Sequence, residues 1–322
     1  MIQIMPKINL LNFKNEFKDE INRITYRGYS KEPPVVVTGA YYSALNAGEI
    51  KPLPVGELSN LACPTRMDIY MGRIKKKDGK TTWGRVTGQI IDKCIHDFTK
   101  QYQNEKDSKL KVFDHLIKKS SDYLDSFVEV NKRQIGKLNK LKSTPEEDEN
   151  RLIKTLDYTL RYELSMLFLQ NSLTNGKANN MSINCELEII PNCMTTGISK
   201  ATPDFFIPEL SIIGDIKSGV EFKRYYPLTA AGYALAYENA HNTNVDLGLI
   251  YFFPTRQRDF SLAHLHIFVI DDILRAAFFQ ARDKSFEIMK DKNNYPPFPE
   301  NDTGCSFCKY EDDCKLLRLR LR

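Results

Sequence analysis

The second half of the sequence alternates short apolar runs with stretches of helical periodicity, and this order limits the possible folds more than any other feature. The apolar runs have the length and composition of β-strands; they span residues 183–190, 203–208, 210–219, 245–254 and 262–270. Apolar residues at helical spacing occupy 226–241 and 271–290. The order predicts an α/β or α+β fold in which helices flank a central mixed sheet.

The first half is dominated by helical patterns. We expect one helix over residues 57–73 and another over 83–102, where apolar side chains recur every three or four residues. Residues 1–55 contain several prolines and are interpreted as an N-terminal extension. The highly charged segment at about 103–180 is interpreted as a helical insertion in a single domain that spans residues 56–322.

The sequence carries no feature of an exported or membrane-bound protein. Its N-terminus lacks the basic segment, apolar stretch and cleavage site of a secretory signal. No apolar run approaches the ~20 residues that a membrane-spanning helix needs, so we expect a cytoplasmic protein with no membrane partner. Because the cytoplasm keeps thiols reduced, the seven cysteines indicate metal ligation, catalysis or core packing rather than a disulfide framework.

Basic residues cluster in three runs although the net charge is only +5; the runs span residues 73–80, 131–142 and 315–322. Such clustering favours a polyanionic partner such as a nucleic acid. A solvated helix or loop face would produce the same runs. Charge alone therefore leaves both interpretations open.

A carboxylate and a lysine share one face of the strand predicted at 210–219. Alternate residues of a strand point to the same side, so Asp215 and Lys217 project together while the side chain of Ile216 points away. With Asp204 on the neighbouring strand and the carbonyl oxygen of Ile216, they offer the hard oxygen ligands that a divalent cation needs. Such a cation activates water and stabilises phosphate charge, while Lys217 positions the water or helps to deprotonate it. The pattern predicts phosphodiester hydrolysis.

The spacing Asp-x-Lys is weak evidence by itself, and it occurs again at Asp78, Asp107 and Asp313. Asp215 differs because an apolar strand precedes it, a Ser-Gly turn follows it, and charges on a buried strand are costly without a partner or a function. His96, on the second predicted helix, would add an imidazole ligand and favour manganese. Taken alone, a histidine on a helix is better explained by a surface or core position, and the acids predicted with it reverse that preference.

Three cysteines near the C-terminus have the spacing of a metal site. Cys305 and Cys308 can bind one centre, and Cys314 follows within about one turn of chain. Cys63 is the remote fourth ligand and would join the two ends of the domain. Four cysteines accept either zinc or an iron–sulfur cluster, so the metal stays open at this point. The other cysteines lack partners at such spacing and are interpreted as packing residues: Cys94, Cys185 and Cys193.

These residues follow the order found in a known nuclease family. The shared positions are Cys63-Pro64, Gly88, His96, Asp204, Asp215-Ile216-Lys217, Tyr233 and the C-terminal cysteines. With them the chain resembles the RecB-like nucleases of the PD-(D/E)xK superfamily that carry an iron–sulfur cluster. It is most similar to the CRISPR-associated exonuclease family, in its longer archaeal-type branch, where CPT-R-x-D-x-Y follows the first cysteine. The similarity runs from about residue 57 to 316 and is weak over 103–180.

The resemblance implies two metal sites. In one, His96, Asp204 and Asp215 bind Mn²⁺ or Mg²⁺, and Lys217 is catalytic. The core around them would be the restriction-endonuclease-like core of the superfamily. In the other, a structural [4Fe–4S] cluster is held by Cys63, Cys305, Cys308 and Cys314. Three of these ligands lie in the C-terminal segment 300–322.

The resemblance also implies an activity. Such nucleases cleave single-stranded DNA, commonly from a 5′ end, and trim DNA ends before CRISPR integration proteins insert them as new spacers. Tyr233 is a candidate DNA contact or a core aromatic. Thr229 replaces the glutamine of the family's glutamine–tyrosine motif, so the direction in which the strand is cleaved stays open. One alternative is a repair or recombination nuclease that acts with a helicase. The helicase would be a separate protein, since the chain has no GxxxxGK[ST] motif. The other alternative is a catalytically silent adaptor that binds DNA ends.

Overall fold

The computed structural model describes most of the chain on either side of the charged middle segment. The described residues are 13–30, 39–104, 122, 124–131, 153–154, 156–157, 183–254, 263–300, 305 and 308–320. The insertion predicted at 103–180 therefore lies almost entirely outside them. Within these ranges no helix is both long enough and apolar enough to cross a membrane.

Within the described residues, five strands form one mixed sheet in the order β1-β2-β3-β4-β5. The strands are β1 (Asn184–Cys185), β2 (Phe205–Ile207), β3 (Ile212–Gly219), β4 (Leu247–Pro254) and β5 (His264–Val269). Strands β3 and β4 are parallel, and the other neighbouring pairs are antiparallel. The predicted mixed sheet is confirmed, and each of the apolar runs contributes a strand to it.

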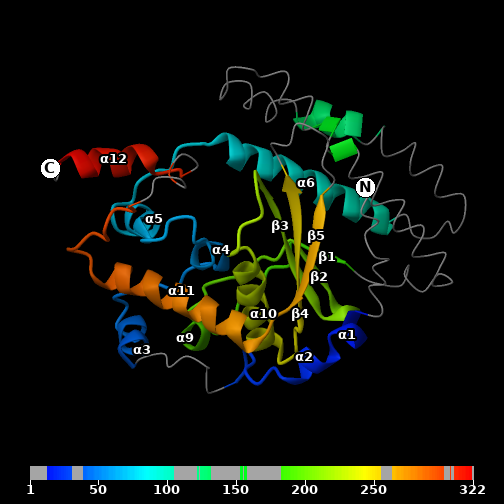
Figure 1. Cartoon of the computed structure of the whole chain (residues 1–322), viewed down its shortest axis with the longest axis horizontal. Coiled ribbons are helices and arrows are strands. Elements are labelled where there is room, and N and C mark those ends of the chain that lie inside the picture. Colours follow the sequence, from blue (N-terminus) through cyan, green and yellow to red (C-terminus); the bar gives the residue numbers. More distant parts are fainter. Residues whose placement is uncertain are drawn as a thin grey trace, which may run out of the picture.

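Helices surround this sheet (Figure 1). Short helical segments come before the sheet in the sequence: α1 (Phe13–Glu16), α2 (Lys18–Asn22), α3 (Gly39–Asn46), α4 (Val55–Leu58), α5 (Met67–Ile69) and the π-helical turn η2 (Tyr70–Ile74). The longer helices are α6 (Trp83–Asn104), α10 (Pro227–His241), α11 (Asp272–Lys290) and α12 (Glu311–Arg320). A short helix α9 (Cys193–Thr196) and a 3-10 turn η4 (Pro208–Leu210) flank β2 in the sequence. The helices predicted at 83–102, 226–241 and 271–290 are confirmed.

The two faces of the sheet bury different cores. Helix α6 contacts β3 on one face, where Ile90 and Ile216 belong to the same core cluster. Helix α10 provides the crossover that the parallel pair β3–β4 requires and covers the other face, with Ala230 fully buried and α11 packed behind it (Figure 1). Because side chains alternate along β3, Ile213 and Asp215 point to the α10 side.

A buried network of charged side chains joins the N-terminal part of the chain to α10 and α11. Glu238 on α10 is 0% exposed and accepts hydrogen bonds from both terminal nitrogens of Arg275 and from Nη1 of Arg27. It also accepts one from the backbone N–H of Gly28, and Arg27 forms a second ion pair with Asp246 at 2.8 Å. We call Arg27, Glu238, Asp246 and Arg275 the arginine–glutamate network. Through it, part of the predicted N-terminal extension is built into the core.

The single helix predicted over residues 57–73 is wrong. The structure has the short helix α4, a loop, and then α5 followed by η2. Pro64 disfavours helix at the residue before it, and Arg66 adopts a left-handed backbone conformation with φ 60°. The buried guanidinium of Arg66 donates to the carbonyl oxygens of Glu57 and Asn60, which satisfies carbonyls that the end of α4 leaves without helical partners. The break leaves Cys63 in a loop.

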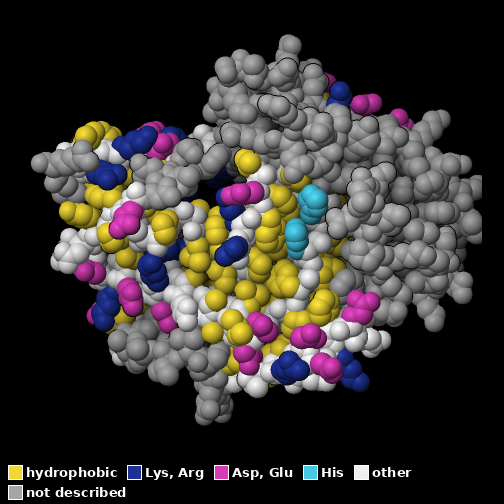
Figure 2. Space-filling model, viewed as in Figure 1, with side chains coloured by type: hydrophobic (Ala, Val, Ile, Leu, Met, Phe, Trp, Pro, Cys, Tyr) yellow, Lys and Arg dark blue, Asp and Glu magenta, His cyan; other side chains and the backbone are white. Residues whose placement is uncertain are grey.

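The face of the molecule seen in Figure 2 carries a broad hydrophobic surface. A neighbouring pair of histidine side chains lies at its edge, and acidic and basic side chains lie around it. Open apolar surface of this kind marks a candidate interaction site more often than isolated apolar residues do.

Candidate metal centre and cysteine cavity

Strand β3 brings together the predicted carboxylate and lysine. Asp215 is 3% exposed, and its Oδ2 forms an ion pair with Nζ of Lys217. The lysine side chain is 28% exposed, so the pair opens toward solvent on one side. Burial lowers the pKa of Lys217, but the neighbouring carboxylates of Asp215 and Asp204 outweigh that effect and raise it. The lysine is therefore a stable ammonium beside two acids.

Asp204 is held next to this pair by the antiparallel contact of β2 with β3. Its backbone N–H donates to the carbonyl oxygen of Gly214 at 3.1 Å, and its Oδ2 accepts a hydrogen bond from the backbone N–H of Ile216. Burial, and then the negative charges of Asp215 and Asp92, raise the pKa of Asp204 well above its ordinary value. These contacts use the amide of Ile216, and ligation by its carbonyl oxygen stays a prediction.

Helix α6 carries His96 to the same place. His96 is 3% exposed, and the ligand atoms of Asp92, His96 and Asp204 all lie within 4.8 Å of one another. A Cβ at Gly88 would lie 3.1 Å from Oγ of Ser218, so glycine at this position favours the close approach of α6 to β3. The tertiary fold thus gathers residues that are more than a hundred positions apart in the sequence.

Some polar atoms of this group have no hydrogen-bond partner within the described residues. Both ring nitrogens of His96 and Oδ1 of Asp92 are buried without one, although Nδ1 of His96 lies 3.6 Å from carboxylate oxygens of Asp92 and Glu186. Buried polar atoms without partners are costly, and an imidazole among carboxylates is a donor set that suits manganese or a similar divalent cation. The residues therefore fit such a cation. We call Asp92, His96, Asp204, Asp215 and Lys217 the acid–histidine centre.

Asp92 is the member of this centre that sequence reasoning missed. It precedes His96 by four residues, so the two side chains lie on the same side of α6. That spacing was the available signal, but acid–histidine pairs one turn apart are also ordinary features of a helix surface. Burial raises the pKa of Asp92, the positive charge of a protonated His96 opposes this, and the charge of Asp215 adds to it.

Helix α10 contributes Tyr233 to the centre. Tyr233 is 6% exposed, and its hydroxyl donates to Oδ1 of Asp215 at 3.3 Å. Burial and the nearby Asp215 raise the pKa of Tyr233 well above its ordinary value, which keeps the phenol a donor. Thr229, at the position of the family glutamine, instead contacts Oγ of Ser59 at 3.0 Å and joins α10 to the end of α4. A contact of Tyr233 with DNA stays a prediction.

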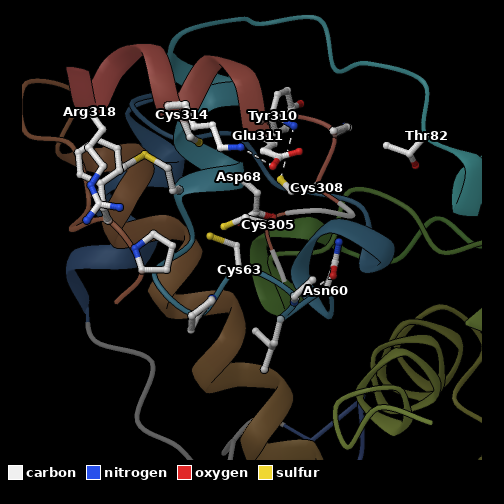
Figure 3. A pocket seen from close by; sticks show the side chains of 18 of the residues that line it. Asn60, Cys63, Asp68, Thr82, Cys305, Cys308, Tyr310, Glu311, Cys314 and Arg318 are labelled. Atoms are coloured by element: carbon white, nitrogen blue, oxygen red, sulfur yellow. Dashed lines mark hydrogen bonds and ion pairs between the residues drawn. The ribbon is translucent and has the colours of Figure 1, made fainter. Parts of the chain in front are cut away.

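The four predicted cysteine ligands line one cavity of about 660 Å³ (Figure 3). Cys63 comes from the loop before α5, Cys305 and Cys308 precede α12, and Cys314 lies in the first turn of α12. A small apolar cluster supports them, formed by Met67, Tyr70, Met71 and Tyr310. The fold therefore brings together the four residues on which the cysteine prediction rests. Cys94, in contrast, lies on α6 and packs in the core.

The donor set of this cavity fits a metal that binds thiolates. Burial, followed by the neighbouring Cys308, Cys63 and Cys305, raises the pKa of Cys314 to about 12. Thiols with raised pKa values ionise when a metal supplies positive charge. Zinc, with Zn–S bonds of about 2.3 Å, would draw four sulfurs to about 3.8 Å from one another. Among the described residues no three cysteine sulfurs lie within 4.8 Å of one another, and the identity of the metal stays a prediction.

The basic runs have less free charge than the sequence suggests. In the run at 73–80, Lys80 pairs with Glu311 and Asp312, and Lys77 pairs with Asp313. These contacts join that run to the acidic first turn of α12, beside the cysteine cavity. The run at 131–142 lies, apart from its first residue, outside the described residues. The structure therefore supports a packing role for the first run.

Comparisons with known proteins agree with one another. The model of the family described as CRISPR-associated exonuclease Csa1 matches residues 1–315, which include the acid–histidine centre and the four cysteines of the cavity. A protein of Saccharolobus solfataricus named CRISPR-associated exonuclease Csa1 is 31% identical over 114 residues, 35% of this chain and 38% of that protein. The alignment thus spans well under half the length of this relative. Because the family model covers nearly the whole sequence, the chain belongs to the CRISPR-associated exonuclease Csa1 family.

Proposed function

We propose that the protein is a metal-dependent exonuclease that hydrolyses phosphodiester bonds at the ends of single-stranded DNA. The observation that carries the proposal is the acid–histidine centre. In it the ligand atoms of Asp92, His96 and Asp204 lie within 4.8 Å of one another. Asp204 also lies beside the buried Asp215, which is paired with Lys217. The family to which the chain belongs is described as an exonuclease, which supports the same activity. The centre has the residue types of a PD-(D/E)xK site.

Four residues of the centre have a part in the proposed reaction. A divalent cation, when bound, lowers the pKa of a water molecule and stabilises negative charge on the phosphate. Asp204, Asp215 and His96 hold that cation. The ammonium of Lys217 orients the attacking water and offsets charge on the phosphate oxygens, since its ion pair with Asp215 fixes it beside the metal-binding atoms.

We further propose that the cysteine cavity holds a [4Fe–4S] cluster with a structural part. Its four ligands come from a loop near residue 63 and from the segment around α12, which are far apart in the sequence. A shared cluster would fix these two segments to each other. Loss of the cluster would then release α12 and the loop before α5, and would affect stability before chemistry.

The biological role proposed here is the trimming of DNA ends before CRISPR integration proteins insert them as new spacers. The words "CRISPR-associated" in the descriptions of the family and of the relative support this setting. A repair nuclease that serves a helicase would use the same chemistry. The proposed partners are therefore single-stranded DNA and CRISPR integration proteins.

The decisive test is cleavage of end-labelled single-stranded DNA by the full chain in the presence of Mn²⁺, with Lys217→Ala as the variant. Loss of the ammonium should lower the cleavage rate by about 10²- to 10³-fold, as removal of a charge-stabilising group does. Lys292→Ala, which changes an exposed lysine beyond α11, is the matched control. Labels on either end report polarity, and a circular strand reports internal cleavage. A wild-type protein that binds DNA without cutting it would contradict the proposal and favour an adaptor.

A further inference from the structure

A group of aromatic side chains lies beside the acid–histidine centre and has no part in the proposed reaction. Phe222 and Tyr226 come from the connection between β3 and α10, Phe252 from β4, and His264 and His266 from β5. The ring of Phe222 lies over that of His266, with centroids 4.1 Å apart, and contacts Tyr226 and Phe252 edge to face. We call these five residues the aromatic platform.

The register of the sheet fixes where the platform lies. Lys217 on β3 pairs with Phe252 on β4, which pairs with His264 on β5. One pair further along, Asp215 and His266 are joined through the same strand β4. Residues in register on neighbouring strands point to the same face. Two strand spacings of about 4.8 Å therefore separate the catalytic pair from the histidines, about 10 Å in all.

Tyr226 links the platform to the acid–histidine centre. A Cβ placed on Gly219, at the end of β3, would lie 3.3 Å from the hydroxyl oxygen of Tyr226. Burial raises the pKa of Tyr226 to about 12, and the negative charge of Asp215 adds to this effect. Tyr226 thus brings the platform close to Asp215, on the face of the sheet to which Asp215 points.

Four of the five platform rings lie outside the buried core. Phe252 is buried, but the side chains of Phe222, Tyr226, His264 and His266 stay partly exposed. In the described part of the chain, the two histidines belong to no group of three ligand atoms within 4.8 Å of one another. Burial, and then His264, lower the pKa of His266, so its ring is an uncharged flat surface at neutral pH. Partly exposed rings can stack on a ligand.

Positive charge accompanies the rings. Lys223 and Arg224 directly follow Phe222, and Arg224 is exposed. Lys223 pairs with Glu221, which leaves Arg224 as the more available cation of the two. An aromatic surface flanked by a cation, next to a site for a phosphate group, matches the chemistry of a single nucleic-acid strand, in which flat bases alternate with charged phosphates.

We propose that the aromatic platform stacks an unpaired base of the DNA strand whose scissile phosphate lies at the acid–histidine centre. This inference rests on the proposed function and adds the reason for a single-stranded substrate. In a duplex both faces of each inner base are covered by neighbouring bases, whereas an unpaired base can turn a face toward Phe222 and His266. The platform therefore selects single strands through the base, while Lys217 and Arg224 contact phosphates that every strand has.

The experiment measures binding of labelled oligonucleotides of about twelve nucleotides, within the usual size of a single-strand site. The full chain carries Lys217→Ala so that the strand stays intact, and one base at a time is removed while its sugar and phosphate remain. Removal of the stacked base should weaken binding about 5- to 150-fold, whereas removal of most other bases should have little effect. On the same background, Phe222→Ala should weaken binding of the intact strand to a similar degree and should abolish the dependence on that base.

Controls separate stacking from folding. Phe222→Leu keeps the apolar volume without a π face and should bind like Phe222→Ala, while Phe222→Trp and His266→Phe should bind like the parent. Tyr295→Ala, which removes an aromatic ring that is 41% exposed in another part of the molecule, should bind unchanged. Circular dichroism checks that each variant is folded.

The outcomes distinguish this inference from the proposed function. Parental binding by Phe222→Leu, or a base dependence that persists undiminished in that variant, would overturn the platform. A wild-type protein that cleaves DNA with no dependence on any single base would also overturn it and leave the proposed function intact. A stacked position detected in a wild-type protein that never cleaves would support the platform and contradict the nuclease.

Discussion

The two buried groups of charges that α10 contacts differ in how completely their polar atoms are used. In the arginine–glutamate network, Glu238 accepts from two arginines and from the backbone N–H groups of Gly28 and Val245. Each of the three side-chain nitrogens of Arg275 donates a hydrogen bond. In the acid–histidine centre, by contrast, both ring nitrogens of His96 are buried without such a partner among the described residues.

The difference shows that burial of charge does not by itself indicate a functional site. Both groups contain acids and bases, and both contact α10, through Tyr233 in one case and Glu238 in the other. A network whose hydrogen bonds are complete holds segments together and has nothing left to offer a ligand. Atoms left without partners are available to a metal, and their cost to the metal-free fold is recovered when the metal binds. Substitution of one residue in each group tests this distinction.

The largest effect is expected for Asp215→Asn. The amide keeps the size of the side chain but removes the charge that holds the cation and pairs with Lys217. We expect a fall in cleavage rate on the order of 10³-fold, about 4 kcal/mol of transition-state stabilisation. The free energy of unfolding should change by less than about 1 kcal/mol, because Asp204 still compensates Lys217. Cleavage kinetics and urea denaturation on the same preparation measure both, and a large loss of stability would place Asp215 with the structural charges.

The opposite pattern is expected for Glu238→Gln. Removing the charge of Glu238 leaves the buried Arg275 without its carboxylate partner, and breaking a buried ion pair in this way costs about 3–5 kcal/mol. Urea denaturation followed by circular dichroism measures this loss, and the exposed Glu300→Gln serves as the control. Folded Glu238→Gln protein should bind Mn²⁺ as the wild type does. Weakened metal binding without a loss of stability would contradict the structural assignment.

The sequence predicts the sheet well because its strands have distinct local patterns. The apolar residues around Asp215 define β3, and the long apolar periodicity of α6 defines that helix. The turn expected at Ser218-Gly219 is wrong, because both residues continue β3 and pair with β4. The helix expected at 57–73 does not form as one element, because Arg66 adopts a left-handed backbone conformation. The guanidinium of Arg66 then donates to the carbonyl oxygen of Glu57 on α4. Nothing in a local pattern shows that a residue adopts such a conformation to satisfy distant carbonyl groups.

The candidate site shows the same limit. Asp204, Asp215 and Lys217 can be proposed from strand alternation, and the spacing of Cys305, Cys308 and Cys314 predicts their common cavity. Asp92 differs from other acids on α6 only because the helix packs that turn against Asp204, a contact of tertiary structure. The aromatic platform likewise depends on the register between β4 and β5, which places His266 under Phe222. Residues that function through contacts across the sheet carry little signal in their own segment.

A smaller effect is expected for Asp92→Ala, which sharpens the boundary of the acid–histidine centre. If Asp92 binds or orients the cation with His96, its loss should lower the affinity for Mn²⁺ by about 10- to 100-fold. Isothermal titration calorimetry with Mn²⁺ alone measures this without reference to activity. Asp97→Ala, an acid on the same helix outside the group of ligand atoms, should bind as the wild type does. Equal affinities for the two variants would restrict the centre to the residues that the sequence predicts.

The smallest expected effect is a dependence of stability on pH, which should distinguish the acid–histidine centre from the arginine–glutamate network. The raised pKa of Asp204 means that the folded chain binds a proton more tightly than the unfolded chain does. The free energy of unfolding of metal-free protein should therefore fall as pH rises from the ordinary carboxyl pKa of about 4 toward the raised value.

Mn²⁺ binds the deprotonated carboxylate. The increase in Tm that Mn²⁺ produces should therefore grow with pH over the same window. The affinity for Mn²⁺ should change by at most about tenfold per pH unit for each proton released. Thermal melts with and without Mn²⁺ between about pH 5 and 8, where folded proteins are generally most stable, measure this increase. Asp204→Asn should remove most of the increase in Tm together with its pH dependence, because the amide neither binds a proton nor supplies a charged ligand to the cation. Glu238→Gln should lower Tm throughout and retain the dependence, since the arginine–glutamate network does not share the metal. An increase in Tm that is the same at every pH would mean that the raised pKa of Asp204 has no link to the cation. Asp204 would then be a buried carboxyl without a part in metal binding.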